Sequence, residues 1–131
     1  MYRWVEHTGE LELQIEAPTE HAVFADALAA FAELVDDGGG VSSDRREIVL
    51  EGDSRDVMLA DWLNELVYLS DAEQFVPDDL AELGLESGGL RAAVRGHHGL
   101  PTPLVKAASL HGLEYGRAPD GRWQARVVLD V

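Results

Sequence analysis

Hydrophobic and polar residues follow a period of two in the first predicted element and a period of about 3.6 in the next. Leu11, Leu13 and Ile15 alternate with polar residues, which is typical of a strand with one buried face. Pro18 ends this strand. Thr19 is then suited to cap a helix, because its side-chain oxygen can accept a hydrogen bond from the first helical turn.

A helix is predicted directly after this cap. Four bulky apolar residues recur at helical spacing and would form one buried stripe, namely Phe24, Leu28, Phe31 and Val35. Successive glycines at positions 38–40 end the helix. A second strand is predicted over 46–51, and a second helix follows with Asp53 or Ser54 as its cap. The apolar face of this second helix consists of Leu59, Trp62, Leu63, Leu66 and Leu69.

The second half of the chain predicts mainly strands. Residues 74–86 show no clear pattern, whereas 90–95 has strand character. The pattern breaks at His97 and His98, which we expect to lie in an exposed loop.

Two further strands are predicted over 105–115 and 123–129. The residues at 118–121 contain Pro and Gly where a hairpin turn needs them. The predicted order is therefore β-α-β-α-β-β-β, with helices early and strands late, which indicates an α+β fold. A length of 131 residues without repeats or linkers predicts a single domain over 1–131.

The composition disfavours or excludes several classes of function. The chain carries 25 acidic residues against ten Lys and Arg, for a formal charge of −15, which disfavours direct binding to nucleic acid. An acidic surface suits a basic protein partner, although GC-rich coding or a salt-adapted proteome would also produce it. Cysteine is absent, which excludes disulfides and thiol chemistry. No apolar run approaches the roughly 20 residues of a membrane span, and the chain does not start with a secretory signal, so we expect no membrane contact and a cytoplasmic location.

Lys106 is the only lysine in the chain. A sequence with so many acidic residues makes almost no use of lysine on its surface, so the presence of Lys106 indicates a local role for this residue. Survival by chance would explain it as well.

Three polar groups of residues are candidates for chemistry. The turn at 6–10 contains His7 and Glu10, although an ordinary loop with a glycine explains it equally. In the second helix a polar face lies beside the apolar one, and a solvated helix face accounts for it too; its members are Asp61, Asn64, Glu65 and Tyr68. At the end of the chain, Asp130 and the carboxylate of Val131 could bind a hard divalent cation with a third oxygen, or form a solvated tail.

Other common site signatures are missing from the sequence. The five histidines show no spacing for a zinc site. Motifs for a nucleotide-binding loop and for a serine nucleophile are also absent.

Four segments together resemble the archease family, whose members activate the RtcB-type RNA ligase that joins tRNA exons. Residues 6–10 (E-H-T-G-E) resemble the family's E-H-T-A-D turn, and residues 61–68 (D-W-L-N-E-L-V-Y) resemble its D-W-L-N-E-L-L-Y helix. Residues 105–114 (V-K-A-A-S-L-H-G-L-E) resemble V-K-A-V-T-Y-H-G-L-E, and residues 126–131 (R-V-V-L-D-V) resemble R-V-I-L-D-[IV]. The helix and lysine motifs are the most specific of the four.

The resemblance implies a role for particular residues. Glu10, Asp130 and Val131 would be metal ligands, and Lys106 falls on the family's functional lysine. His7, Asp61 and Glu65 would support the site or contact the partner. It also implies an α+β sandwich, in which two helices pack on mostly antiparallel sheets.

The resemblance further implies an accessory protein rather than an enzyme. It would promote transfer of guanylate from GTP to the active-site histidine of an RtcB-type ligase and allow repeated turnover, in tRNA splicing or RNA repair. It would meet tRNA only through the ligase. An all-oxygen ligand set favours Ca²⁺, Mg²⁺ or Mn²⁺ over zinc.

Two positions depart from the family pattern, since Glu10 replaces aspartate and Gly9 replaces alanine. The extra methylene shifts the carboxylate by about 1.5 Å, which a flexible glycine turn can absorb. Two other functions remain open. One is a stand-alone metal-dependent phosphohydrolase that uses Glu10, Asp130 and Lys106, and the other is a general acidic chaperone-like module.

Overall fold

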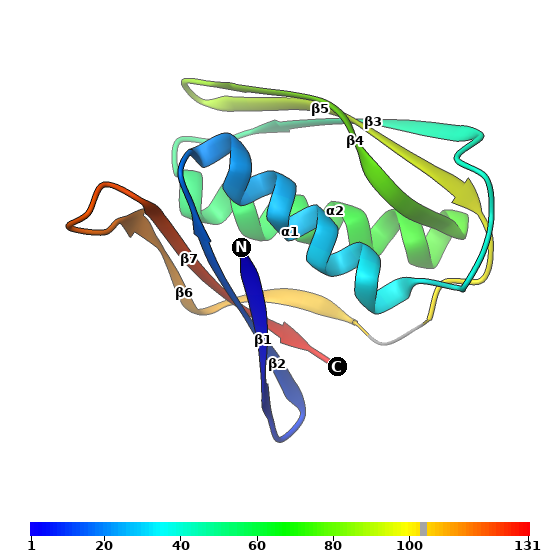
Figure 1. The fold of residues 1–131 in the computed structure, drawn as a ribbon, viewed down its shortest axis with the longest axis horizontal. Coiled ribbons are helices and arrows are strands. Elements are labelled where there is room, and N and C mark those ends of the chain that lie inside the picture. The colour runs from blue at the N-terminus through cyan, green and yellow to red at the C-terminus, as the bar shows by residue number, and fades with distance from the viewer. Residues whose placement is uncertain (103–104) are drawn as a thin grey trace.

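The chain folds into two antiparallel sheets with two helices enclosed between them (Figure 1). The computed structural model describes residues 1–102 and 105–131. Its elements, in chain order, are β1 (Tyr2–His7), β2 (Glu10–Ala17), α1 (Glu20–Val35), β3 (Asp44–Glu51), α2 (Arg55–Glu73), β4 (Phe75–Glu86), β5 (Gly89–His98), β6 (Ala107–Arg117) and β7 (Trp123–Asp130).

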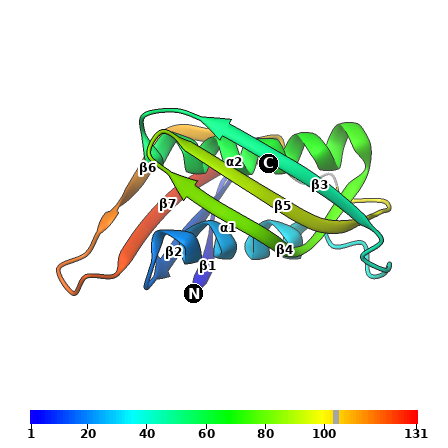
Figure 2. The same ribbon diagram turned by 90° about the horizontal axis from the view of Figure 1, so that it is seen from above.

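The two sheets differ in how far apart their strands lie in the sequence. One sheet has the order β1-β2-β7-β6, so the second strand of the chain pairs with the last one at its centre, and the other has the order β3-β5-β4. Figure 2 shows β3, β5 and β4 crossing over the helix pair. The α+β class predicted from the order of elements and the antiparallel sandwich implied by the family resemblance are both confirmed.

The predicted apolar stripes of both helices form the core. Every residue named for them is at most 5% exposed. Thr19 caps α1 as expected, because its Oγ1 accepts a hydrogen bond of 3.1 Å from the Ala22 amide. The helices contact each other through Trp62 of α2, whose Nε1 donates to the Phe24 carbonyl of α1 at 3.1 Å. Neither helix is long and apolar enough to cross a membrane.

Two strands were not predicted. β1 forms a hairpin with β2 around a turn at Thr8 and Gly9. β4 covers the stretch that gave no pattern, and its pairing with β5 shifts register after Pro77 and again after Leu80. Each bulge changes which face the following residues occupy, so a strand with two bulges loses its alternation in sequence.

The prediction for His97 was wrong. β5 continues to His98, and His97 is only 5% exposed. Its Nδ1 lies 2.9 Å from a carboxylate oxygen of Asp78, and its Nε2 lies 2.9 Å from one of Asp37. The two carboxylates satisfy both ring nitrogens, which removes the cost of burying them. The hydrogen bonds that His97 makes to these carboxylates, foremost the one to Asp78 and next the one to Asp37, raise the pKa of His97, although burial acts to lower it.

Candidate functional site

Four residues form a row across one end of the four-stranded sheet. Glu10 of β2 pairs with His7 of β1 on one side and with Asp130 of β7 on the other, and Asp130 pairs in turn with Ala107 of β6. Directly opposed residues of antiparallel strands project from the same face. Leu11, the next residue of β2, packs against the core, so the row faces outward, away from the helices.

The last residue of the chain lies at the same end of the sheet. The Val131 amide donates to the Gly9 carbonyl at 3.4 Å, which places Val131 beside the β1–β2 turn. Gly9 has a φ of 75°, a left-handed conformation that glycine adopts without strain. The fold therefore brings together the backbones of the three residues expected to bind metal, Glu10, Asp130 and Val131.

The chemistry of this set fits a hard cation. Two carboxylates that face each other repel unless a positive charge lies between them, and carboxylate oxygens are the ligands that Ca²⁺, Mg²⁺ and Mn²⁺ accept. Within residues 1–102 and 105–131, no three His, Cys, Asp or Glu side chains gather closely enough to hold a metal. The third ligand predicted from the sequence, Val131, is not one of these residue types, so its part in a metal site stays a prediction. The His7 side chain pairs with a different acid, since its Nε2 lies 3.3 Å from Oε1 of Glu12.

Lys106 is the immediate neighbour of Asp130 through the backbone. Its amide donates to the Asp130 carbonyl at 2.8 Å. The residue is exposed, and it lines a cavity of about 410 Å³ whose apolar wall includes Phe31, Val35 and Val67 of the helices. The ion pairs of the described part of the chain do not join Lys106 to Glu10 or to Asp130. The lysine and the carboxylates thus share the end of the sheet, but the carboxylates lie on its outer face and the lysine at the cavity by the helices.

Asn64 makes contacts that the sequence did not predict. Asn64 of α2 accepts a hydrogen bond of 2.8 Å from the Ala108 amide and donates one of 3.3 Å to the Ala108 carbonyl. The sequence pattern left open whether Asn64 belongs to a candidate site or to a solvated helix face. Asp61 is exposed and Glu65 is partly exposed, and no hydrogen bond in the described residues links either of them to Lys106. Their role in support or partner contact stays a prediction.

The next row of the outer face contains a buried acid. Glu12 is 5% exposed, and the Arg126 Nε lies 2.9 Å from its carboxylate. Its pKa is held below the usual value, chiefly by a hydrogen bond from Gln14 and further by Arg126, while burial acts in the opposite direction. Glu12 is therefore a fixed negative charge, already compensated, beside the row that contains Glu10.

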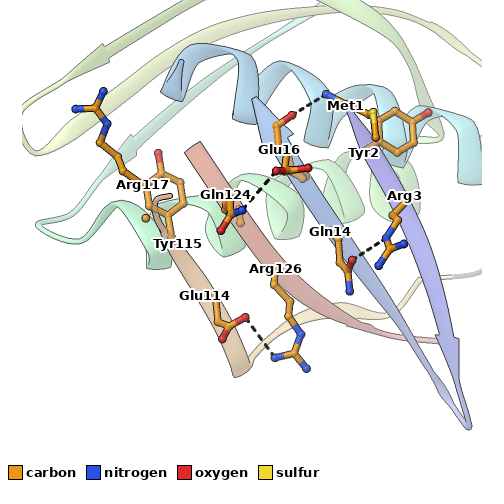
Figure 3. A pocket seen from close by; sticks show the side chains of 13 residues that line it. Met1, Tyr2, Arg3, Gln14, Glu16, Glu114, Tyr115, Arg117, Gln124 and Arg126 are labelled. Carbon is orange, nitrogen blue, oxygen red and sulfur yellow. Dashed lines mark hydrogen bonds and ion pairs between the residues drawn. The ribbon is translucent and has the colours of Figure 1, made fainter. Parts of the chain in front are cut away.

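A hollow larger than the cavity beside Lys106 lies elsewhere on the same outer face. It has a volume of about 650 Å³ and is lined by residues of all four strands and by Met1 (Figure 3). Its polar side chains pair with one another, Arg3 with Gln14, Arg126 with Glu114 and Gln124 with Glu16. Because these groups satisfy each other and Glu10, Asp130 and Lys106 are not among its lining residues, the hollow is not the candidate site.

The described residues define a class of α+β domain in which two helices lie between two antiparallel sheets, and in which the four-stranded sheet carries two facing acids, Glu10 and Asp130, at one end. Residues 2–131 match the archease protein family (MTH1598/TM1083). The protein archease of Pyrobaculum neutrophilum is 31% identical, over 99% of this chain and 95% of that protein. The protein archease of Pyrococcus furiosus is also 31% identical and is covered completely by the alignment, as is this chain. The chain belongs to the archease family.

Two solved structures share the fold. Protein 1598 of Methanobacterium thermoautotrophicum superposes with a TM-score of 0.75 and 23% identity, covering 99% of this chain and 98% of that one. A Thermotoga maritima protein described as an archease and possible chaperone gives a TM-score of 0.67 at 18% identity, covering 100% and 98%. None of these descriptions names a catalysed reaction.

Proposed function

We propose that this chain is an accessory protein of an RtcB-type RNA ligase, acting in the cytoplasm. It would promote transfer of guanylate from GTP to the ligase and so allow the ligase to turn over repeatedly. The observation that carries the proposal is the backbone hydrogen bond between Lys106 and Asp130, with Glu10 directly opposite Asp130, in a chain of the archease family.

The site's own residues suggest what it would do. Glu10, Asp130 and Val131 would hold a divalent cation, which would supply positive charge to a triphosphate or pyrophosphate. The Lys106 ammonium is suited to donate hydrogen bonds to phosphate oxygens. Because these residues occupy the end of the sheet, a triphosphate lying across that end could reach the cation on the outer face and Lys106 on the side of the helices. A charge of −15 repels the RNA backbone, so tRNA would be met only through the ligase.

The test compares ligase guanylylation with and without this protein. Lys106→Ala should abolish the stimulation while leaving the protein as stable as before, because the side chain is exposed. Arg122→Ala is the matched control, since it removes an exposed cation beside the β6–β7 turn, at the other end of the sheet. Full stimulation by Lys106→Ala would contradict the proposal. Steady release of phosphate from GTP by the protein alone, with Mn²⁺ present, would favour a phosphohydrolase instead.

A chaperone-like function is the second candidate, and it is favoured by the description of the Thermotoga maritima relative. In that case the acidic surface would keep clients in solution. Protection of several unrelated aggregating proteins, undiminished in Lys106→Ala, would support it over ligase activation.

A further inference from the structure

The side-chain amide of Asn64 pairs with the backbone of one residue in the neighbouring strand. Its Oδ1 accepts from the Ala108 amide at 2.8 Å, and its Nδ2 donates to the Ala108 carbonyl at 3.3 Å. β6 is the last strand of its sheet, with β7 on one side. At Ala108 the amide of Asn64 therefore makes the two bonds that a further strand would make.

Asparagine is an unfavourable choice for the middle of a helix unless its side chain has a specific partner. It is a weak helix former, because its side chain competes for nearby backbone groups. Leucine, glutamate and alanine are the stronger formers that surround it in α2. The two bonds to Ala108 explain why this position carries an amide: they satisfy both polar ends of a partly buried group.

These bonds act two residues away from the only lysine. On one side of the segment the Lys106 amide is held by the Asp130 carbonyl of β7, and on the other side Ala108 is held by Asn64 of α2. Ala107, between them, is the residue that faces Asp130 in the row. The first residues of β6 are thus fixed from both the sheet and the helix.

We propose that Asn64 is a positioning residue, which sets the Lys106 side chain relative to Asp130 and Glu10. The functional meaning of this role rests on the proposed function, but the positioning itself does not. Loss of the amide would free the start of β6 from α2 while leaving the β6–β7 pairing and the core in place.

Because Lys106 is the only lysine, the effect of Asn64 on its side chain can be measured on this protein alone, without the ligase. Reductive methylation with ¹³C-formaldehyde labels only Lys106 and the α-amino group, keeps their charge, and gives one NMR signal for each. Asn64→Ala removes both bonds, and Asn64→Asp keeps an acceptor for the Ala108 amide but no donor for its carbonyl. Thr19→Ala is the control for stability, because it removes one side-chain-to-backbone bond at the start of α1.

We expect the Lys106 signal to shift and sharpen in Asn64→Ala, to change less in Asn64→Asp, and to stay unchanged in Thr19→Ala. With the ligase, Asn64→Ala should lower maximal stimulation by roughly tenfold, since a displacement of about 1 Å can cost up to 10²-fold. The protein concentration that gives half-maximal stimulation should not change, because Lys106 and the residues expected to contact the partner, Asp61 and Glu65, remain.

The possible outcomes distinguish the positioning role of Asn64 from the proposed activation of the ligase. An unchanged Lys106 signal in Asn64→Ala, together with stimulation equal to that of Thr19→Ala, would overturn the positioning role. If the wild-type protein does not stimulate the ligase, the proposed function fails, and the Lys106 signal alone then decides whether Asn64 positions the lysine.

Discussion

Glu10 and Asp130 lie directly opposite each other on β2 and β7, with their side chains on the same outward face of the sheet. Like charges in this arrangement destabilise a strand pair by about 0.2–1 kcal/mol. A cation that binds both carboxylates reverses this effect, and any ligand that binds only the folded state stabilises it. The acidic pair therefore makes metal binding visible in unfolding experiments.

The first prediction concerns metal addition. Ca²⁺, Mg²⁺ or Mn²⁺ should raise the unfolding free energy relative to EDTA, by about 2.7 kcal/mol at a concentration one hundred times Kd. Asp130→Asn should abolish this response and slightly stabilise the protein in EDTA, because it removes one of the two facing charges. Glu47→Gln, at an exposed position of the other sheet, should keep the full response. Equal metal responses in Asp130→Asn and the wild type would show that the cation binds elsewhere.

The second prediction concerns the last residue. Removing Val131 deletes its hydrogen bond to Gly9 and moves the terminal carboxylate onto Asp130. Ligase stimulation should fall, while the unfolding free energy should change by less than about 1 kcal/mol, as expected for one backbone hydrogen bond. Guanylylation assays and urea unfolding measure the two effects. Unchanged stimulation by the truncated protein would rule out a need for this terminus.

The elements that the sequence predicted well are those with a regular period. The stripe from Phe24 to Val35 and the cap at Thr19 use only local information, and both are confirmed. β4 was not predicted because its two bulges, after Pro77 and Leu80, disrupt the alternation that identifies a strand.

Site features that depend on distant contacts were harder to predict. The burial of His97 depends on Asp37, which lies 60 residues away in sequence, and no local pattern signals that pairing. The proximity of Glu10 and Asp130 follows from the pairing of β2 with β7, which periodicity cannot supply. Asn64 did leave a signal, because it is a weak helix former in the interior of a long helix.

The third prediction concerns pH. The raised pKa of His97 means that the folded state binds this proton more tightly than the unfolded state, whose ordinary value is about 6.5. Its stabilising effect is therefore complete below about pH 6.5 and is lost as pH rises through the raised value. The pKa of Asp37 is lowered, chiefly by its hydrogen bond to His97, so its effect is present above its ordinary value and is lost as pH falls through the lowered one.

His97→Gln tests this dependence. Other donors also face this cluster: the Ser42 hydroxyl donates to Asp78 at 2.6 Å, and the backbone amides of Gly39 and Leu100 donate to Asp37 at 3.3 Å and 3.2 Å. At pH 6 the variant should lose about 2 kcal/mol of unfolding free energy, as expected for hydrogen bonds to a charged group. The difference from the wild type should shrink as pH rises above the folded-state pKa of His97. Urea unfolding from pH 5 to 9 measures it, and a difference that stays constant across this range would contradict a charged His97.

The fourth prediction separates stability from the site. Trp62 is fully buried, donates to the Phe24 carbonyl, and meets the Phe24 ring edge-on at a centroid distance of 6.3 Å. Trp62→Phe removes the donor and leaves space in the core, which should lower the unfolding free energy by about 2–3 kcal/mol. Tyr68→Phe on the same helix is the control, because Tyr68 is 55% exposed and its loss should stay within about 0.5 kcal/mol. Stimulation of the ligase per folded molecule should remain unchanged in both variants, since among the described residues no hydrogen bond joins Trp62 or Tyr68 to Lys106. A Trp62→Phe protein that is as stable as the wild type would mean that the packing of α1 against α2 contributes little to the core.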